Sequence, residues 1–141
     1  MEIFSTDIDT QVLSRSESGI YSQFEVQRGL PIKRLMKHFT QVEADWQIKD
    51  GLRERIEWKQ YNLLDDFSHF GPFDVVFCRN VLIYFDVPTK ADILDRICKV
   101  THPSGYLFLG SAETVLGTCD RFERFRECNS AVYRPVAGVP A

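Results

Sequence analysis

The chain has 141 residues, of which 44% are hydrophobic and 26% are charged, and its formal net charge is −3. This composition is typical of one globular domain, and the scattered basic residues argue against a nucleic-acid surface. No apolar run is long enough to cross or insert into a membrane, and the amino terminus shows no secretion signal, so we expect a cytoplasmic protein.

The cysteines and histidines do not predict a metal site. The four cysteines show no C-x-x-C spacing, and the three histidines are dispersed along the chain. Cys78 and Cys98 lie in apolar surroundings, so we expect buried thiols, which fits a reducing cytoplasm.

The amino-terminal segment predicts a strand followed by a helix. The strand covers residues 2–5, and the helix begins near Asp9 or Thr10 and ends at Gly19. Asp7 follows the strand directly, where a carboxylate in nucleotide-binding folds accepts hydrogen bonds from a ribose diol. Taken alone, its residue type slightly favours a capping or turn role over a ribose ligand.

Residues 30–52 predict a small insertion between two strands of the main sheet. It contains a short helix begun by a proline and a strand over residues 46–49, which ends at an Asp-Gly turn. The insertion can cover the sheet edge or dock a partner. Residues 53–61 alternate in polarity and predict a strand with one exposed face. Asn62 and Leu63 follow it, and they can contact an adenine ring or simply hold a turn.

The most informative stretch is the apolar run over residues 73–78, which is followed by Arg79 and Asn80. A continuous apolar run predicts a central parallel strand that is buried on both faces. Ligands of open α/β sheets bind beyond the carboxyl ends of the strands, so Arg79 and Asn80 are candidate site residues. Tyr84 is close enough in sequence to join them. The alternative is a polar, solvent-exposed loop.

The last third of the chain predicts a helix, a strand and a hairpin. Asp86 is the expected N-cap, Pro88 belongs to the first turn, and an apolar face continues to Val100. The remaining segments are a helix stop over residues 101–105, a buried strand over 106–110, hairpin strands over 121–126 and 131–134, and a frayed tail over 136–141. This order predicts one α/β domain over residues 1–135, with an antiparallel edge.

Five segments together resemble the CheR-type chemotaxis receptor methyltransferases. They are Thr6-Asp7-Ile8-Asp9, Gly19-Ile20-Tyr21, Asn62-Leu63-Leu64, the run from Phe73 through Cys78-Arg79-Asn80 to Tyr84-Phe85-Asp86, and Pro103-Ser104-Gly105-Tyr106-Leu107. The resemblance covers nearly the whole chain. It implies a class I (Rossmann-like) methyltransferase sheet, S-adenosylmethionine or S-adenosylhomocysteine as the bound cofactor, and methyl transfer to glutamate carboxylates of chemotaxis receptors.

The resemblance also implies roles for individual residues. The implied cofactor contacts are Asp7 on the ribose, Asn62 and Leu63 on the adenine, and Arg79 and Asn80 beside the methionyl portion. Arg79 would also steer the substrate carboxylate. Tyr84 would lie near the transferred methyl group and help to orient that carboxylate by a hydrogen bond. No metal is needed, because a sulfonium methyl group is already electrophilic and a glutamate side chain is ionised near neutral pH.

Two parts of the family pattern are not found in this sequence: an amino-terminal helical domain, and a first strand with a glycine-rich turn. All eight glycines are isolated. That first strand would lie between the strands at 2–5 and 73–78, so two edges are expected to remain unpaired. They would pair with each other or join two chains, and we favour a homodimer. We expect this partial domain to bind S-adenosylmethionine weakly and to methylate nothing by itself. The alternative function is a non-catalytic, protein-binding remnant of the fold in signalling.

Overall fold

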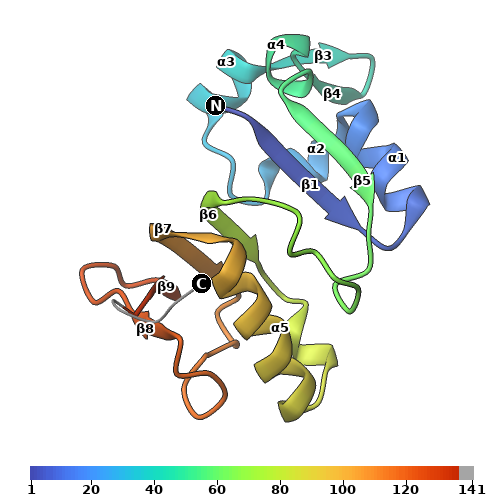
Figure 1. Ribbon diagram of the computed structural model, residues 1–141. Helices are drawn as coiled ribbons and strands as arrows, with labels where there is room; N and C mark the ends of the chain where they lie inside the picture. The colour runs from blue at the N-terminus through green and yellow to red at the C-terminus, as the bar shows by residue number, and fades with distance from the viewer. Residues whose placement is uncertain (137–141) are drawn as a thin grey trace. The chain divides into compact units, whose positions relative to one another are not determined.

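The computed structural model describes residues 1–136, which form two compact units (Figure 1). The first unit covers residues 1–62, and the second begins at Leu63. Each unit mixes helices and strands, which confirms the α/β class. The strands form separate sheets of two, three and four members, so a continuous class I sheet order stays a prediction. None of the helices within residues 1–136 has the length and apolar character needed to span a membrane.

The first unit contains the predicted amino-terminal strand and helix. Strand β1 (Ile3–Asp7) pairs in parallel with β5 (Ile56–Gln60), as Figure 1 shows. Helix α1 (Thr10–Ser18) follows β1, and the Asp9 side chain accepts hydrogen bonds from two backbone N–H groups of its first turn. Gly19 ends the helix with a φ of 66°, a left-handed conformation that glycine adopts without steric cost.

Residues 20–53, in the middle of the first unit's sequence, form a small antiparallel sheet with short helices. Its strand order is β2-β4-β3. Its elements are β2 (Ile20–Ser22), α2 (Gln23–Gln27), α3 (Ile32–His38), β3 (Phe39–Val42), β4 (Asp45–Ile48) and α4 (Asp50–Arg53). Its core consists of buried Val26, Leu35 and Trp46, against which Tyr21, Leu30 and Phe39 pack.

Two details of the middle segment differ from the sequence predictions. Strands β2 and β3 were not predicted, because three or four residues are too few to show a period of two, and both depend on pairing with β4. The Asp-Gly pair at Asp50 was expected to form a turn. It begins the single helical turn α4 instead, in which the Arg53 side chain donates to the Asp50 carboxylate at 2.8 Å.

The second unit is a four-stranded sheet in the order β6-β7-β9-β8. Strands β6 (Phe73–Cys78) and β7 (Thr101–Leu109) are parallel, and the predicted terminal hairpin is confirmed as β8 (Phe122–Arg124) and antiparallel β9 (Val132–Pro135). Val136 is the last described residue, so the rest of the predicted tail lies outside the described residues.

Helix α5 (Val87–Val100) connects β6 to β7 and was predicted with its correct ends. The Asp86 side chain accepts from the backbone N–H of Thr89 at 3.0 Å, as expected for an N-cap. Its buried side chains are Ile93, Leu94, Ile97, Cys98 and Val100. The predicted helix stop is confirmed, because Thr101 is the C-cap, but the predicted start of the next strand at residue 106 was wrong. The chain enters β7 directly at Thr101, and the pairing with β6 is irregular before it becomes regular at Tyr106.

The prediction that the strand over 73–78 is buried on both faces was wrong. β6 is the end strand of its sheet and pairs only with β7 among residues 1–136. Cys78 is buried, but Val75 and Phe77 point to the opposite face, where their exposed fractions are 45% and 69%. β1 likewise pairs only with β5 within this range. Within its own unit, each of these strands therefore pairs on one side only.

Candidate functional site

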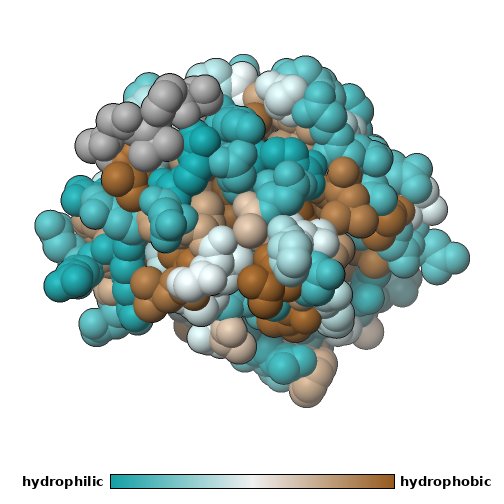
Figure 2. Space-filling view, turned by 60° about the horizontal axis from the view of Figure 1, so that its bottom comes forward, coloured by the Kyte–Doolittle hydropathy of each residue, from teal (hydrophilic) through white to brown (hydrophobic). Residues whose placement is uncertain are grey.

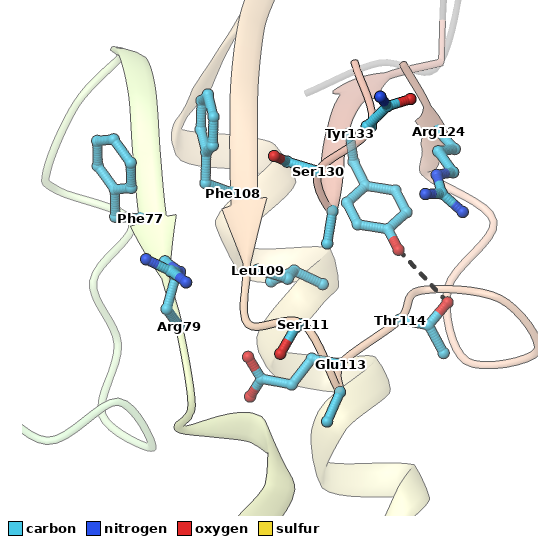
Figure 3. Close-up of a pocket in the computed structure, with 13 residues that line it drawn as sticks. Phe77, Arg79, Phe108, Leu109, Ser111, Glu113, Thr114, Arg124, Ser130 and Tyr133 are labelled. Carbon is cyan, nitrogen blue, oxygen red and sulfur yellow. Dashed lines mark hydrogen bonds between the residues drawn. The ribbon is translucent and has the colours of Figure 1, made fainter. Parts of the chain in front are cut away.

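Four segments of the second unit meet at the carboxyl edge of its parallel strands. Since β9 is antiparallel to β7, its beginning lies at the edge where β6, β7 and β8 end. These segments line a pocket of about 620 Å³ (Figure 3). The lining residues lie at the end of β6 (Phe77, Arg79), at and after the end of β7 (Phe108, Leu109, Ser111–Thr114), at the end of β8 (Arg124) and at the start of β9 (Asn129–Ala131, Tyr133). A volume of this size can hold a small ligand or a peptide side chain.

One wall of the pocket is aromatic, and much of the remaining lining is polar. The rings of Phe77 and Phe108 stack with their centroids 4.8 Å apart, and they stand side by side in Figure 3. The Tyr133 hydroxyl donates to the Thr114 hydroxyl at 3.4 Å. The arrangement suits a ligand with an aliphatic stem and a polar end.

Glu113 organises the loops at this edge. Its side chain is only 7% exposed, and its carboxylate accepts four backbone hydrogen bonds. The donors are the N–H groups of Asn80 and Gly110, both at 2.7 Å, of Leu82 at 2.8 Å and of Val81 at 3.0 Å. Burial raises the pKa of this carboxyl, but the four N–H groups outweigh burial, so the pKa lies below its usual value. An ionised Glu113 therefore ties the segment after β6 to the end of β7.

The backbone at this junction is closely packed. Asn80 has a φ of 59°, a left-handed conformation that Asn tolerates better than most residues. A Cβ atom at Gly110 would lie 2.6 Å from the Glu113 carboxylate and 3.0 Å from the Asn80 nitrogen. Only glycine therefore fits at position 110 without displacing the carboxylate.

The second unit contains four of the six residues predicted for the site. Arg79 lines the pocket, and its side chain is drawn below Phe77 in Figure 3. Asn80 contributes its backbone N–H to Glu113. Tyr84 ends the short 3₁₀ helix η1 (Leu82–Tyr84) and is 81% exposed, outside the pocket lining. Leu63 lies in a half-buried turn.

The other two predicted residues, Asp7 and Asn62, belong to the first unit. Asp7 is the last residue of β1, and its carboxylate accepts the backbone N–H of Asp9 at 2.9 Å. This hydrogen bond gives Asp7 the turn role that its residue type suggested. Asn62 follows β5 and is half-buried. The predicted cofactor contacts are thus divided between the two units, and their joint action stays a prediction.

The role of Glu113 was not predicted from the sequence. Its position after a buried strand was visible in the segment Ser111-Ala112-Glu113-Thr114, and an acidic side chain at that place was the available signal. Its partners, however, are as many as 33 residues away, and backbone N–H groups carry no residue type. No local pattern could therefore have identified them.

Known proteins that resemble this chain identify its family. The family model described as "CheR methyltransferase, SAM binding domain" matches residues 1–131. The chain belongs to this family. Since the matched model is that of a SAM-binding domain, S-adenosylmethionine is the cofactor of the family.

Relatives in three organisms agree with this assignment. Chemotaxis protein methyltransferase Cher2 of Pseudomonas putida is 38% identical over 134 residues, which are 94% of this chain and 49% of that protein. The chemotaxis protein methyltransferase of Vibrio parahaemolyticus is 34% identical, with 94% and 48% covered. That of Salmonella typhimurium is 38% identical, with 79% and 40% covered. The chain spans about half the length, or less, of these relatives.

Proposed function

We propose that this chain is the S-adenosylmethionine-binding part of a protein-glutamate O-methyltransferase that methylates chemoreceptors. The observation that carries the proposal is the family match over residues 1–131, together with relatives named chemotaxis protein methyltransferases. The pocket at the carboxyl edge of β6 and β7 supports it, because that edge is where open α/β sheets bind ligands.

The residues of the second unit suit the amino-acid end of the cofactor. The exposed Arg79 guanidinium has no ion pair within residues 1–136, so we place it beside the methionyl portion, where it is also free to steer the carboxylate of the acceptor glutamate. Glu113 fixes the backbone of Asn80 beside it. For the ribose and adenine we propose Asp7, Asn62 and Leu63.

Positioning is the main task of the protein in this reaction. Bound S-adenosylmethionine supplies an electrophilic methyl group, and the acceptor glutamate is already ionised near neutral pH. We assign Arg79 to binding the acceptor carboxylate and Tyr84 to orienting it by a hydrogen bond. Holding the reacting groups in line can supply several kcal/mol of barrier reduction. Weakly polar surfaces such as the Phe77 and Phe108 rings also do not oppose the loss of sulfonium charge.

A chimera tests the function directly. The chain replaces the half of the Pseudomonas putida relative that it matches, and base-labile methyl esters are counted on chemoreceptor-containing membranes. We expect ester formation, and we expect Arg79→Gln to lower it by at least about tenfold, the effect of a lost charge-assisted hydrogen bond. Arg126→Gln, an exposed arginine outside the pocket, is the matched control. A folded chimera that forms no esters would refute the proposal.

For residues 1–141 alone we propose weak S-adenosylmethionine binding, no methyl transfer and a homodimer. The support for the dimer is that β1 and β6 each pair on one side only within their own unit, so the other side of each strand can pair with another chain. Light scattering on a sizing column tests it, and a purely monomeric protein at micromolar concentration excludes it. Calorimetry tests the affinity, and a micromolar or tighter constant contradicts weak binding.

A further inference from the structure

Residues 63–72 form a segment without helix or strand that leads from the start of the second unit to β6. The segment begins with Leu63, for which we propose a contact with the adenine ring. Loops are more mobile than the elements that they connect, so a fixed position of Leu63 requires contacts from a regular element. Helix α5 provides these contacts at two places along the segment.

Arg96 of α5 holds the first half of this segment. Its Nη1 donates to the backbone carbonyl of Asp65 at 2.7 Å, and its Cζ lies 4.9 Å from the centre of the Phe67 ring. Its Nε donates to the carboxylate of Asp92, one turn earlier on α5, at 2.9 Å. The Arg96 side chain is only 17% exposed. The pair with Asp92 fixes the planar guanidinium on the helix, so its other donors and its face can hold the segment.

Phe67 is the one buried residue of this segment. Hydrophobic residues, coloured brown, reach the surface in several places in Figure 2, whereas Phe67 is only 6% exposed. Farther along, a Cβ atom at Gly71 would lie 2.7 Å from the Val100 carbonyl oxygen, so the segment passes close to the last turn of α5. The contact with α5 that lies nearest to Leu63 is therefore the one that Arg96 makes.

The apolar residues at the beginning of the segment do not fix their own position by burial. Leu63 is half-buried, and Leu64 is 50% exposed. Side chains of this kind can offer an apolar surface to a flat ring. The hydrogen bond from Arg96 to Asp65, two residues after Leu63, limits where that surface lies.

We propose that Arg96 is a positioning residue for the adenine end of the cofactor. By holding the Asp65 carbonyl and the Phe67 ring against α5, it places Leu63 where the adenine binds. The inference rests on the proposed function, since Leu63 is an adenine contact only in that account. Arg96 is not assigned to the cofactor or the acceptor, so its effect is confined to the affinity for ligands that contain adenine.

Amide NMR titrations of the 141-residue chain with two ligands test this role. Adenosine carries only adenine and ribose, whereas S-adenosylhomocysteine also carries the amino-acid end. Arg96→Gln should weaken both ligands by the same factor of about ten, the cost of ordering one more residue on binding. Arg79→Gln should weaken S-adenosylhomocysteine but not adenosine, because Arg79 is assigned to the methionyl portion.

The matched control is Lys99→Gln on the same helix. The Lys99 ammonium pairs with Asp95 across one helical turn, as Arg96 pairs with Asp92, but it makes no ion pair with residues 63–72. This change should leave both affinities within about twofold, because a largely exposed pair contributes little. Equal effects of Arg96→Gln and Lys99→Gln on adenosine would overturn the inference.

A second variant covers the case in which Arg96→Gln does not fold, which a urea titration detects. Arg96→Lys keeps the positive charge but lacks the planar fork that reaches Asp92 and the Asp65 carbonyl together. It should weaken adenosine and S-adenosylhomocysteine by a smaller factor of about three. Unchanged affinity of a folded Arg96→Lys protein for both ligands would likewise contradict the role of Arg96.

Kinetics separate positioning from a general loss of structure. In the chimera with the Pseudomonas putida relative, Arg96→Gln should raise the KM for S-adenosylmethionine about tenfold and leave kcat within about twofold. This pattern marks the loss of binding that the ground state and the transition state share. A lower kcat with an unchanged KM would show that Arg96 does not act through the adenine end.

The titrations of the wild-type chain distinguish failure of this inference from failure of the proposed function. If the wild type binds S-adenosylhomocysteine and Arg96→Gln binds it equally well, the inference is wrong and the proposed function stands. If neither adenosine nor S-adenosylhomocysteine shifts any signal of the wild type, the proposed function fails and the inference fails with it.

Discussion

The carboxylate of Glu113 accepts the backbone N–H of Asn80 at 2.7 Å and thereby joins the ends of two parallel strands. This bond links a residue buried after β7 to the loop that carries Arg79 and leads to Tyr84. The shape of the candidate site therefore depends on a residue that is not itself assigned to the cofactor or the substrate.

Replacing Glu113 by Gln should destabilise the second unit. A Gln side chain keeps one acceptor oxygen but turns an NH₂ group toward N–H groups, so at least one buried donor is left without a partner. The expected loss is at least about 2 kcal/mol in the free energy of unfolding, measured by urea titration. The control is Glu123→Gln, which removes an exposed ion pair with Arg134 and should cost at most about 1 kcal/mol. Equal losses for the two variants would contradict the role of Glu113.

Lowering the pH should reduce the stability that the ionised Glu113 carboxylate contributes. The pKa of the Glu113 carboxyl lies below its ordinary value in the folded chain, so its stabilisation is fully present above the unfolded pKa and is lost as the pH falls through the folded pKa. The pKa values of Asp86 and Asp95 are also lowered, mainly by hydrogen bonds from Thr89 and Lys99 respectively. The stability that these two carboxylates contribute is therefore also lost as the pH falls.

The comparison of wild type with Glu113→Gln isolates the effect of this one carboxyl. The difference in their free energies of unfolding should be largest near neutral pH and should shrink as the pH falls through the folded pKa of Glu113. A difference that does not change with pH would show that the charge of Glu113 is not what holds the loop.

Gly110→Ala should disturb the same junction from the opposite side. The added Cβ would lie 2.6 Å from the Glu113 carboxylate and closer still to the Asn80 side-chain oxygen, so both side chains must move. We expect a loss of about 1–3 kcal/mol in thermal or urea unfolding. Gly51→Ala is the matched control, because nothing lies within 4 Å of its added Cβ and Gly51 is in helix α4. That change should be neutral or slightly stabilising.

The free cysteines should differ sharply in reactivity. Burial, and to a smaller extent the Glu113 charge, raise the pKa of Cys78 to about 12, so almost no thiolate is present near neutral pH. Cys128 is exposed. Iodoacetamide followed by mass spectrometry of the native protein should label Cys128 first and leave Cys78 unmodified until the chain is unfolded. Comparable native rates would show that β6 opens at its carboxyl end.

The fold could be predicted where the signals are local. Helix α5 follows from the Asp86 cap, the proline in its first turn and the apolar face, all within one segment of sequence. The strand over 73–78 was predicted correctly, but the exposure of one of its faces was not. An apolar run does not reveal that a strand lies at the end of its sheet. Phe77 therefore looked like a core residue and is mostly exposed.

The site could be predicted only in part, for a similar reason. Arg79 was identified from its place after an apolar strand, and it does line the pocket. Arg124 and Glu113 were missed, because the pocket forms from four strand ends that pairing brings together. The pairing of β7 with β6 and β9 joins residues 24 to 31 positions apart, so it depends on the whole sheet and leaves no local pattern at either residue.

The most direct test is an S-adenosylhomocysteine titration of the 141-residue chain followed in its amide NMR spectrum. We predict weak binding, with a dissociation constant above the micromolar range, and signal changes at Asp7, at Asn62 and over residues 79–84. Arg79→Gln should abolish the changes over residues 79–84. The absence of any change in these signals at saturating ligand, or changes confined to other segments, would contradict the assignment of S-adenosylmethionine to this edge of the sheet.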